Sequence, residues 1–214
     1  MKALVYVEGK TDQTGLEVLL RSLIVAREAE GVGIRFFPAR QSDAKKWLLL
    51  NGPTVAAQIL SKDPESHVAI VPDLYPRNKA FPHETQEELE SSLHDRIRAE
   101  LHRMRCDDSR VLDRFHAFCF KYEFEVLVLA CEDLLKAYLH CEEFKVKWTR
   151  PVEQQDHERP PKAVLRELFA AHDVKYQGLL TPVEILERSD YRRLCDACPA
   201  SLGRLVSWLN AIGA

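Results

Sequence analysis

Apolar residues along the first 120 positions alternate between short dense runs and longer stretches with helical spacing. The dense runs predict strands at 4–7, 34–37, 67–71 and 115–120. Residues spaced three or four apart predict helices over 16–24, 43–60 and 84–105, the second bent near Asn51-Gly52-Pro53. Strands that alternate with helices indicate an α/β fold with a mostly parallel sheet.

The pattern changes after Lys121. Helical spacing predominates over 123–138, 161–171 and 199–211, and the polar, proline-bearing piece 145–161 is typical of a long loop or lid. We therefore expect an α/β core over residues 1–121. A helical portion over 122–214 packs on it, and the two form one structural unit.

Composition excludes some classes of function. The chain has 214 residues, 46% of them hydrophobic, and a net charge of −3, which argues against a histone-like or coat protein that binds nucleic acid through bulk positive charge. The longest apolar stretch, 124–130, is too short to span a bilayer, and residues 1–8 lack the features of a signal peptide. The expectation is a cytoplasmic protein with no membrane partner.

Acidic residues follow the predicted strands. Glu8 ends the first strand and Asp73 follows the third, Asp12 lies one turn after Glu8, and Glu123 and Glu125 come after the fourth. The carboxyl ends of parallel strands share one edge of a sheet, so these side chains are expected to converge. Clustered carboxylates call for a neutralising cation, and Mg²⁺ or Mn²⁺ prefers such oxygen ligands.

Some of these acids also have purely structural explanations. Asp12 is well placed to cap the start of a helix, and Glu123 can favour the positive end of its own helix. Glu8 has the weakest structural alternative, because an acid placed directly after an apolar strand is costly without a partner.

Several segments resemble the DUF4276 group of Toprim-like proteins. Glu8-Gly9-Lys10-Thr11-Asp12 is similar to the Glu-Gly-x-Thr-Asp/Glu opening of Toprim domains, found in topoisomerases, primases and defence nucleases. Asp73-Leu74-Tyr75 resembles the Asp-x-Asp/Tyr loop of the group, and Tyr122–Leu127 its Glu-Phe-Glu-Ala-Leu segment. Pro160-Pro161-Lys162 resembles its Pro-Ser-Lys-Arg element. Cys198-Pro199, with Leu205 and Leu209, resembles its terminal helix.

The resemblance implies a Rossmann-like Toprim core that binds divalent metal for phosphodiester chemistry. Glu8 is then a general acid/base or metal ligand, Asp73 a ligand, and Glu125 completes the site, with Glu123 and Asp12 as further candidate ligands. The chain departs from the pattern in two places: Tyr75 replaces a second Asp of many Toprim domains, and Ala163 replaces an Arg after Lys162.

The resulting hypothesis is a metal-dependent nuclease in bacterial anti-phage defence, acting on DNA or RNA, alone or beside an ATPase partner. Lys10, which is also a catalytic candidate, and Lys162 are expected to contact substrate phosphate. The alternative for both lysines is an ordinary solvated side chain. The alternative function is a non-catalytic Toprim-like module that binds a partner protein or a nucleotide.

One further stretch has two interpretations. Lys145, Lys147 and Arg150 surround Trp148 in the predicted lid. Stacking on a nucleic-acid base, with phosphate contacts, is one use of such a stretch, and packing of Trp148 on the core is the other.

Overall fold

In a computed structural model, which describes residues 1–39, 43–106 and 108–213, four strands form one parallel sheet in the order β2-β1-β3-β4. The strands are β1 Lys2–Val7, β2 Gly33–Pro38, β3 Ser66–Val71 and β4 Phe115–Ala117. The α/β fold and the parallel sheet predicted from the sequence are confirmed. The fourth strand is shorter than predicted, although an isolated bridge between Asp73 and Phe120 extends its pairing with β3.

The register places the ends of the central strands at one level. Val7 at the end of β1 lies opposite Pro38 of β2 and Val71 of β3. From β1 the chain moves outward to β2, and then crosses back to β3 on the other side of β1. Open α/β sheets bind ligands at such a reversal of strand order, outside the carboxyl ends of the strands. Here that position lies between the ends of β1 and β3.

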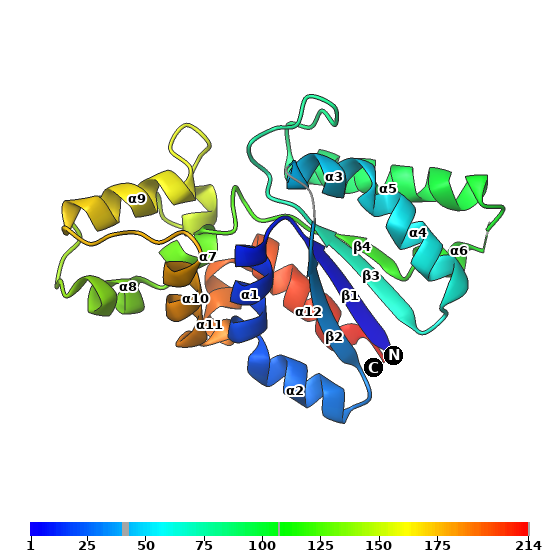
Figure 1. Cartoon of the computed structure of the whole chain (residues 1–214), viewed down its shortest axis with the longest axis horizontal. Coiled ribbons are helices and arrows are strands. Elements are labelled where there is room, and N and C mark those ends of the chain that lie inside the picture. The colour runs from blue at the N-terminus through cyan, green and yellow to red at the C-terminus, as the bar shows by residue number, and fades with distance from the viewer. Residues whose placement is uncertain (40–42, 107, 214) are drawn as a thin grey trace.

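Helices cover both faces of the sheet (Figure 1). The helices with the sheet are α1 Lys10–Leu19, α2 Arg21–Ala29, α3 Ala44–Leu50, α4 Gly52–Lys62, α5 Gln86–Arg103, α6 Ser109–Leu112 and α12 Arg204–Ala211. Those beyond the strand ends are α7 Val126–Leu129, α8 Glu132–Leu139, α9 Pro161–Ala171, α10 Leu180–Glu187 and α11 Tyr191–Ala197, with short turns η1 Val152–Gln154 and η2 Pro199–Gly203. Figure 1 shows α3, α4 and α5 on one face, and α1, α2 and α12 on the other.

Alternate strand residues supply two separate cores. Val68 and Ile70 of β3 pack with Leu89 and Leu93 of α5 on one face of the sheet. The other face buries residues of β1 and β2 in a larger core that also takes in α1, α2 and the C-terminal helices. The helix α12 therefore completes a layer of the sheet, although it is last in the chain.

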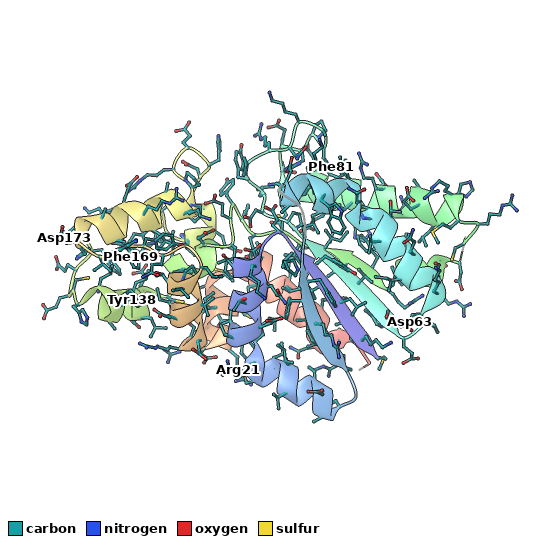
Figure 2. All side chains as sticks on the ribbon, in the orientation of Figure 1. Arg21, Asp63, Phe81, Tyr138, Phe169 and Asp173 are labelled. Atoms are coloured by element: carbon teal, nitrogen blue, oxygen red, sulfur yellow. The ribbon has the colours of Figure 1, made fainter. Side chains whose placement is uncertain are left out.

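The helical portion docks through a close approach at Gly15 of α1. A Cβ atom at this position would lie 2.6 Å from Phe124 Cζ and 3.2 Å from Leu186 Cδ1. Only the missing side chain of glycine lets α1 pack this closely against Phe124 and α10. Farther from the sheet, Tyr138 of α8 faces Phe169 of α9, with ring centroids 5.6 Å apart (Figure 2).

The helical expectations were partly wrong. The helix predicted over 123–138 is two helices, because the chain turns at Cys131, whose thiol donates to the carbonyl of Leu127. The first of them begins only at Val126, so Glu123 and Glu125 precede it. The bend near Gly52 is confirmed as the boundary between α3 and α4. Within the described ranges, no helix is both long and apolar enough to cross a bilayer.

Candidate functional site

Glu8 and Asp73 meet at the level ends of β1 and β3. Glu8 Oε1 accepts the backbone N–H of Asp73 at 3.0 Å, and Asp73 Oδ1 accepts the backbone N–H of Phe124 at 2.8 Å. The two carboxylates thus join both central strands to the segment that leads into α7. The expected convergence of these acids at one edge of the sheet is observed.

Asp12 stabilises a helix start and also faces this group. Its Oδ2 accepts the backbone N–H of Gly9, the N-cap of α1, at 2.9 Å. Negative charge near a helix N-terminus is favourable, which accounts for part of its placement. The side chain is nevertheless buried, and the charges of Glu125 and Lys162 influence its proton affinity. Asp12 thus supports the start of α1 from the third helical position rather than as the N-cap itself, and its role as a metal ligand stays a prediction.

Glu123 and Glu125 both bind Lys162, from different sides. Glu123 Oε2 accepts the backbone N–H of Lys162 at 3.0 Å, so it caps α9 rather than its own helix. Glu125 Oε1 lies 2.8 Å from Lys162 Nζ, with the glutamate side chain 5% exposed and the lysine side chain 40% exposed. The structure thus brings Lys162 into the acidic group, with part of its side chain open to solvent.

Lys45 is a member of the site that the sequence analysis missed. It lies on α3 and is only 7% exposed. Its Nζ donates to the carbonyl oxygen of Asp73 at 2.6 Å and lies 3.8 Å from Glu8 Oε1. The spacing of Lys45 with Leu48 and Leu49 was a usable signal, because it places the lysine on the buried face of its helix.

Lys10 does not join this group. Its ammonium donates to Gln13 Oε1 at 2.9 Å on the exposed side of α1, beside a groove that α1 forms with β2. This contact agrees with the alternative given for Lys10 in the sequence analysis, an ordinary solvated side chain. We accordingly leave Lys10 out of the acidic site defined here, which consists of Glu8, Asp12, Asp73, Glu123, Glu125, Lys45 and Lys162.

Aromatic residues border the acidic site. The ring of Tyr75 stacks on His157 with centroids 4.6 Å apart and 17° between the planes, and meets Tyr122 edge-on at 5.5 Å. Trp148 is different: it is 7% exposed, packs against Phe144 at 4.9 Å, and lies under the guanidinium of Arg150. The packing interpretation of Trp148 is therefore confirmed.

Four acids of the site, Glu8, Asp12, Asp73 and Glu123, have pKa values above those of isolated carboxyl groups. Burial raises the pKa of Glu8 to about 7, and the charges of Asp12 and Glu123 add to the effect, while Lys45 opposes it. Burial and the charge of Glu125 raise the pKa of Asp12 to about 6. The pKa of Asp73 is well above its usual range, through burial and then the charge of Glu8, and burial raises the pKa of Glu123.

The comparison with protein families gives one result. The model of the family described as a domain of unknown function, DUF4276, matches residues 7–210. The chain belongs to the DUF4276 family. Searches of curated proteins and of solved structures returned no match. Every residue of the acidic site lies inside the range matched by the DUF4276 model, so the site is part of the family's domain rather than an appendage to it.

The donor set of this DUF4276 site fits a hard divalent cation. Five carboxylates face two ammonium groups, and oxygen ligands of this kind suit Mg²⁺ or Mn²⁺. In Glu8, Asp73 and Glu123, one oxygen accepts a backbone N–H, which leaves the second oxygen for another partner. As they stand, the described residues contain no group of three or more Asp, Glu, His or Cys side chains arranged as metal ligands.

Proposed function

We propose that this chain is a metal-dependent phosphodiester hydrolase of Toprim type that acts on nucleic acid. The observation that carries the proposal is the convergence of Glu8 and Asp73 at the reversal of strand order, joined there by Glu123 and Glu125 from the helical portion. A polar, negatively charged site at this position of an open α/β sheet favours a ligand that brings its own positive charge.

Glu8, Asp73 and Glu125 are the residues that would hold Mg²⁺ or Mn²⁺, with Glu123 and Asp12 beside them. A bound divalent cation supplies neutralisation of the negative charge that develops on the phosphate. Lys162, whose side chain is 40% exposed and whose Nζ pairs with Glu125, would contact a phosphate oxygen. The alternative role for Glu8 is that of a general acid/base outside the ligands of the cation. In the metal-free site burial raises the pKa of Glu8 to about 7, which suits a carboxylate that exchanges protons with the attacking water or the leaving oxygen.

The Toprim relationship rests on the motifs at Glu8–Asp12 and Asp73–Tyr75. Their places in the fold support it, since Glu8 follows β1 and Asp73 follows β3, the two central strands. The role in anti-phage defence and the ATPase partner follow from the resemblance alone. Both concern the biological process and the partner protein of the proposed hydrolase.

A second candidate is the non-catalytic module, and two contacts favour it. Lys45 and Lys162 already neutralise part of the acidic site, and a tyrosine ring stands at the position of a second aspartate. In this case the site presents a surface to a partner protein or a nucleotide.

Cleavage assays separate the two candidates. Plasmid DNA and single-stranded RNA are incubated with Mg²⁺ or Mn²⁺ and with wild type, Glu8→Gln, Asp73→Asn, or the control Glu28→Gln on the exposed side of α2. We expect the first two variants to lose about 100-fold or more of the activity, as when a general acid/base is removed, and the control to lose none. Equal cleavage by wild type and Glu8→Gln would contradict the proposal. Calorimetric titration with Mn²⁺ that shows no saturable binding would support the non-catalytic module.

A further inference from the structure

Two rings of an aromatic cluster lie on the chain segments that carry Asp73 and Glu123, and a third ring comes from the loop before α9. We define the ring cluster as Tyr75, Tyr122 and His157. The backbone N–H of Tyr75 donates to the carbonyl of Tyr122 at 2.9 Å, and that of Phe124 donates to Asp73 Oδ1 at 2.8 Å. Two residues of extended chain span at most about 7 Å, so these bonds hold the backbone of Tyr75 and Tyr122 close to the residues that carry the carboxylates.

The rings are ordered from a packed base to an exposed end. Tyr75 and Tyr122 are half-buried and pack on the core that α3, α4 and α5 form with the sheet. His157 comes from the loop before α9, is exposed, and lies nearly parallel on Tyr75. A planar ring thus already stacks at this position, and the exposed end of the stack is an imidazole.

Basic side chains lie near the ring cluster, among acidic ones: Arg77 pairs with Glu84, and Asp156 and Glu158 flank His157. The guanidinium carbon of Arg77 lies 5.5 Å from the centre of the Tyr75 ring, and Lys79 on the same loop is exposed. Lys121 directly precedes Tyr122. Aromatic rings combined with cations are the features that bind single-stranded nucleic acid, in which bases stack on rings and phosphates meet ammonium or guanidinium groups.

We propose that the ring cluster is a stacking platform for an unpaired nucleobase, so that the preferred substrate of the acidic site is single-stranded nucleic acid. The base extends the Tyr75–His157 stack on its exposed side, and the neighbouring phosphate reaches the carboxylates and Lys162. Bases inside a duplex are covered on both faces by their neighbours, which denies them this contact. The inference rests on the proposed function for its substrate class, and on the ring geometry for the mode of binding.

Binding measurements test the platform separately from catalysis. Fluorescence anisotropy is recorded with wild type in Ca²⁺, using short labelled oligo(dT) and oligo(U), a duplex, and an abasic chain of equal length and charge. We expect at least about fivefold tighter binding of either base-bearing single strand than of the abasic chain, the lower end of what one stacked base contributes. A duplex with the same number of phosphates as the abasic chain should bind like the abasic chain.

Three variants locate the effect. His157→Ala removes the exposed ring and should abolish the preference for bases, whereas His157→Phe keeps a ring and should retain it. His102→Ala is the matched control, because His102 is an exposed histidine at the C-terminal end of α5, away from the strand ends that carry the site. Thermal denaturation checks that all three variants fold.

Each outcome decides the proposal. A preference for bases that is lost in His157→Ala and kept in His157→Phe supports the platform, even if no cleavage is seen and the proposed hydrolase fails. Equal affinity for oligo(dT), oligo(U) and the abasic chain overturns the platform, as does the absence of binding to any of them. Metal-dependent cleavage together with either of these last two results would keep the hydrolase and remove only the platform.

Discussion

Lys45 Nζ lies 2.6 Å from the carbonyl oxygen of Asp73 and 3.8 Å from Glu8 Oε1, so one buried ammonium group bridges the ends of β3 and β1. The loop after β3 therefore depends on a residue of α3 for its position. Because the carboxylates around it outnumber the ammonium groups, this lysine is also a main source of positive charge inside the acidic site.

Replacing Lys45 with methionine is expected to destabilise the protein strongly near pH 8. Removal of one partner from a buried ion pair costs about 3–5 kcal/mol, because the other charge is left uncompensated. The loss should shrink near pH 5, where Glu8, with a pKa of about 7, is protonated and no longer needs the ammonium. Urea denaturation at both pH values measures the difference. Lys46→Met, the exposed neighbour, should change stability by no more than about 0.5 kcal/mol. Similar losses in the two variants would show that Lys45 is not needed for charge compensation.

In the metal-free protein, the acidic site should make the folded state less stable as the pH rises from about 4 to 7. The folded-state pKa values of Glu8 and Asp12, about 7 and about 6, lie above the ordinary values of 4.5 and 3.8. The folded state therefore binds more protons than the unfolded state in this window, and the free energy of unfolding falls as those protons leave.

Glu8→Gln isolates this contribution. The variant should be more stable than wild type at pH 7 in the presence of a chelator, and the difference should vanish near pH 4. A comparison of wild type with variant is needed because His116, whose pKa burial lowers to about 4, contributes the opposite slope between pH 4 and 6.5. A variant that is less stable than wild type at pH 7 would argue against a destabilising buried charge at Glu8.

Gly15→Ala should loosen the contact between α1 and the helical portion. The new methyl group would meet Phe124 Cζ at 2.6 Å and Leu186 Cδ1 at 3.2 Å, and overpacking of this kind costs about 1–3 kcal/mol. The matched control is Gly178→Ala, whose Cβ would have no neighbour within 4 Å. Chemical denaturation of both variants gives the comparison. If the two substitutions have equal effects, the close approach at Gly15 is not a determinant of docking.

Glu153 should be more important for stability than an ordinary loop glutamate. Its carboxylate accepts the backbone N–H groups of Ala200 and Ser201, both at 2.9 Å, and the Ser201 hydroxyl at 2.5 Å, and it is buried. Glu153→Ala leaves these donors without an acceptor, and each hydrogen bond to a charged group contributes about 1.5–3 kcal/mol. We expect a large fall in the melting temperature, against little change for the exposed Glu158→Ala. A small effect of Glu153→Ala would mean that water replaces the carboxylate.

The strands and most of the acidic site could be predicted from the sequence for one physical reason. Dense apolar runs identify buried parallel strands, and parallel strands present their following residues at one edge. Glu8 and Asp73 are therefore brought together by topology alone. Glu123 and Glu125 follow because Phe120 and Phe124 return the chain to the same edge.

The remaining features depend on contacts that local patterns do not encode. Lys45 occupies its place because α3 packs with its start over the strand ends, and Lys10 misses the site because it points to the solvent side of α1. The short helix α10 escaped prediction because Pro182 lies in its first turn and exposed leucines, Leu179 and Leu180, stand at its start. It is stabilised by packing on α1 and α7.

The hydrogen bond from the backbone N–H of Lys162 to Glu123 links the acidic site to the stability of α9. The helix is 11 residues long, so its other end lies about 16 Å from the carboxylate that caps it. A ligand that competes for Glu123 Oε2 alters the stability of α9, and by thermodynamic reciprocity the state of α9 alters the affinity for that ligand. Binding at the strand ends and the stability of α9 would in this way influence each other, and hydrogen exchange along α9 can report on it.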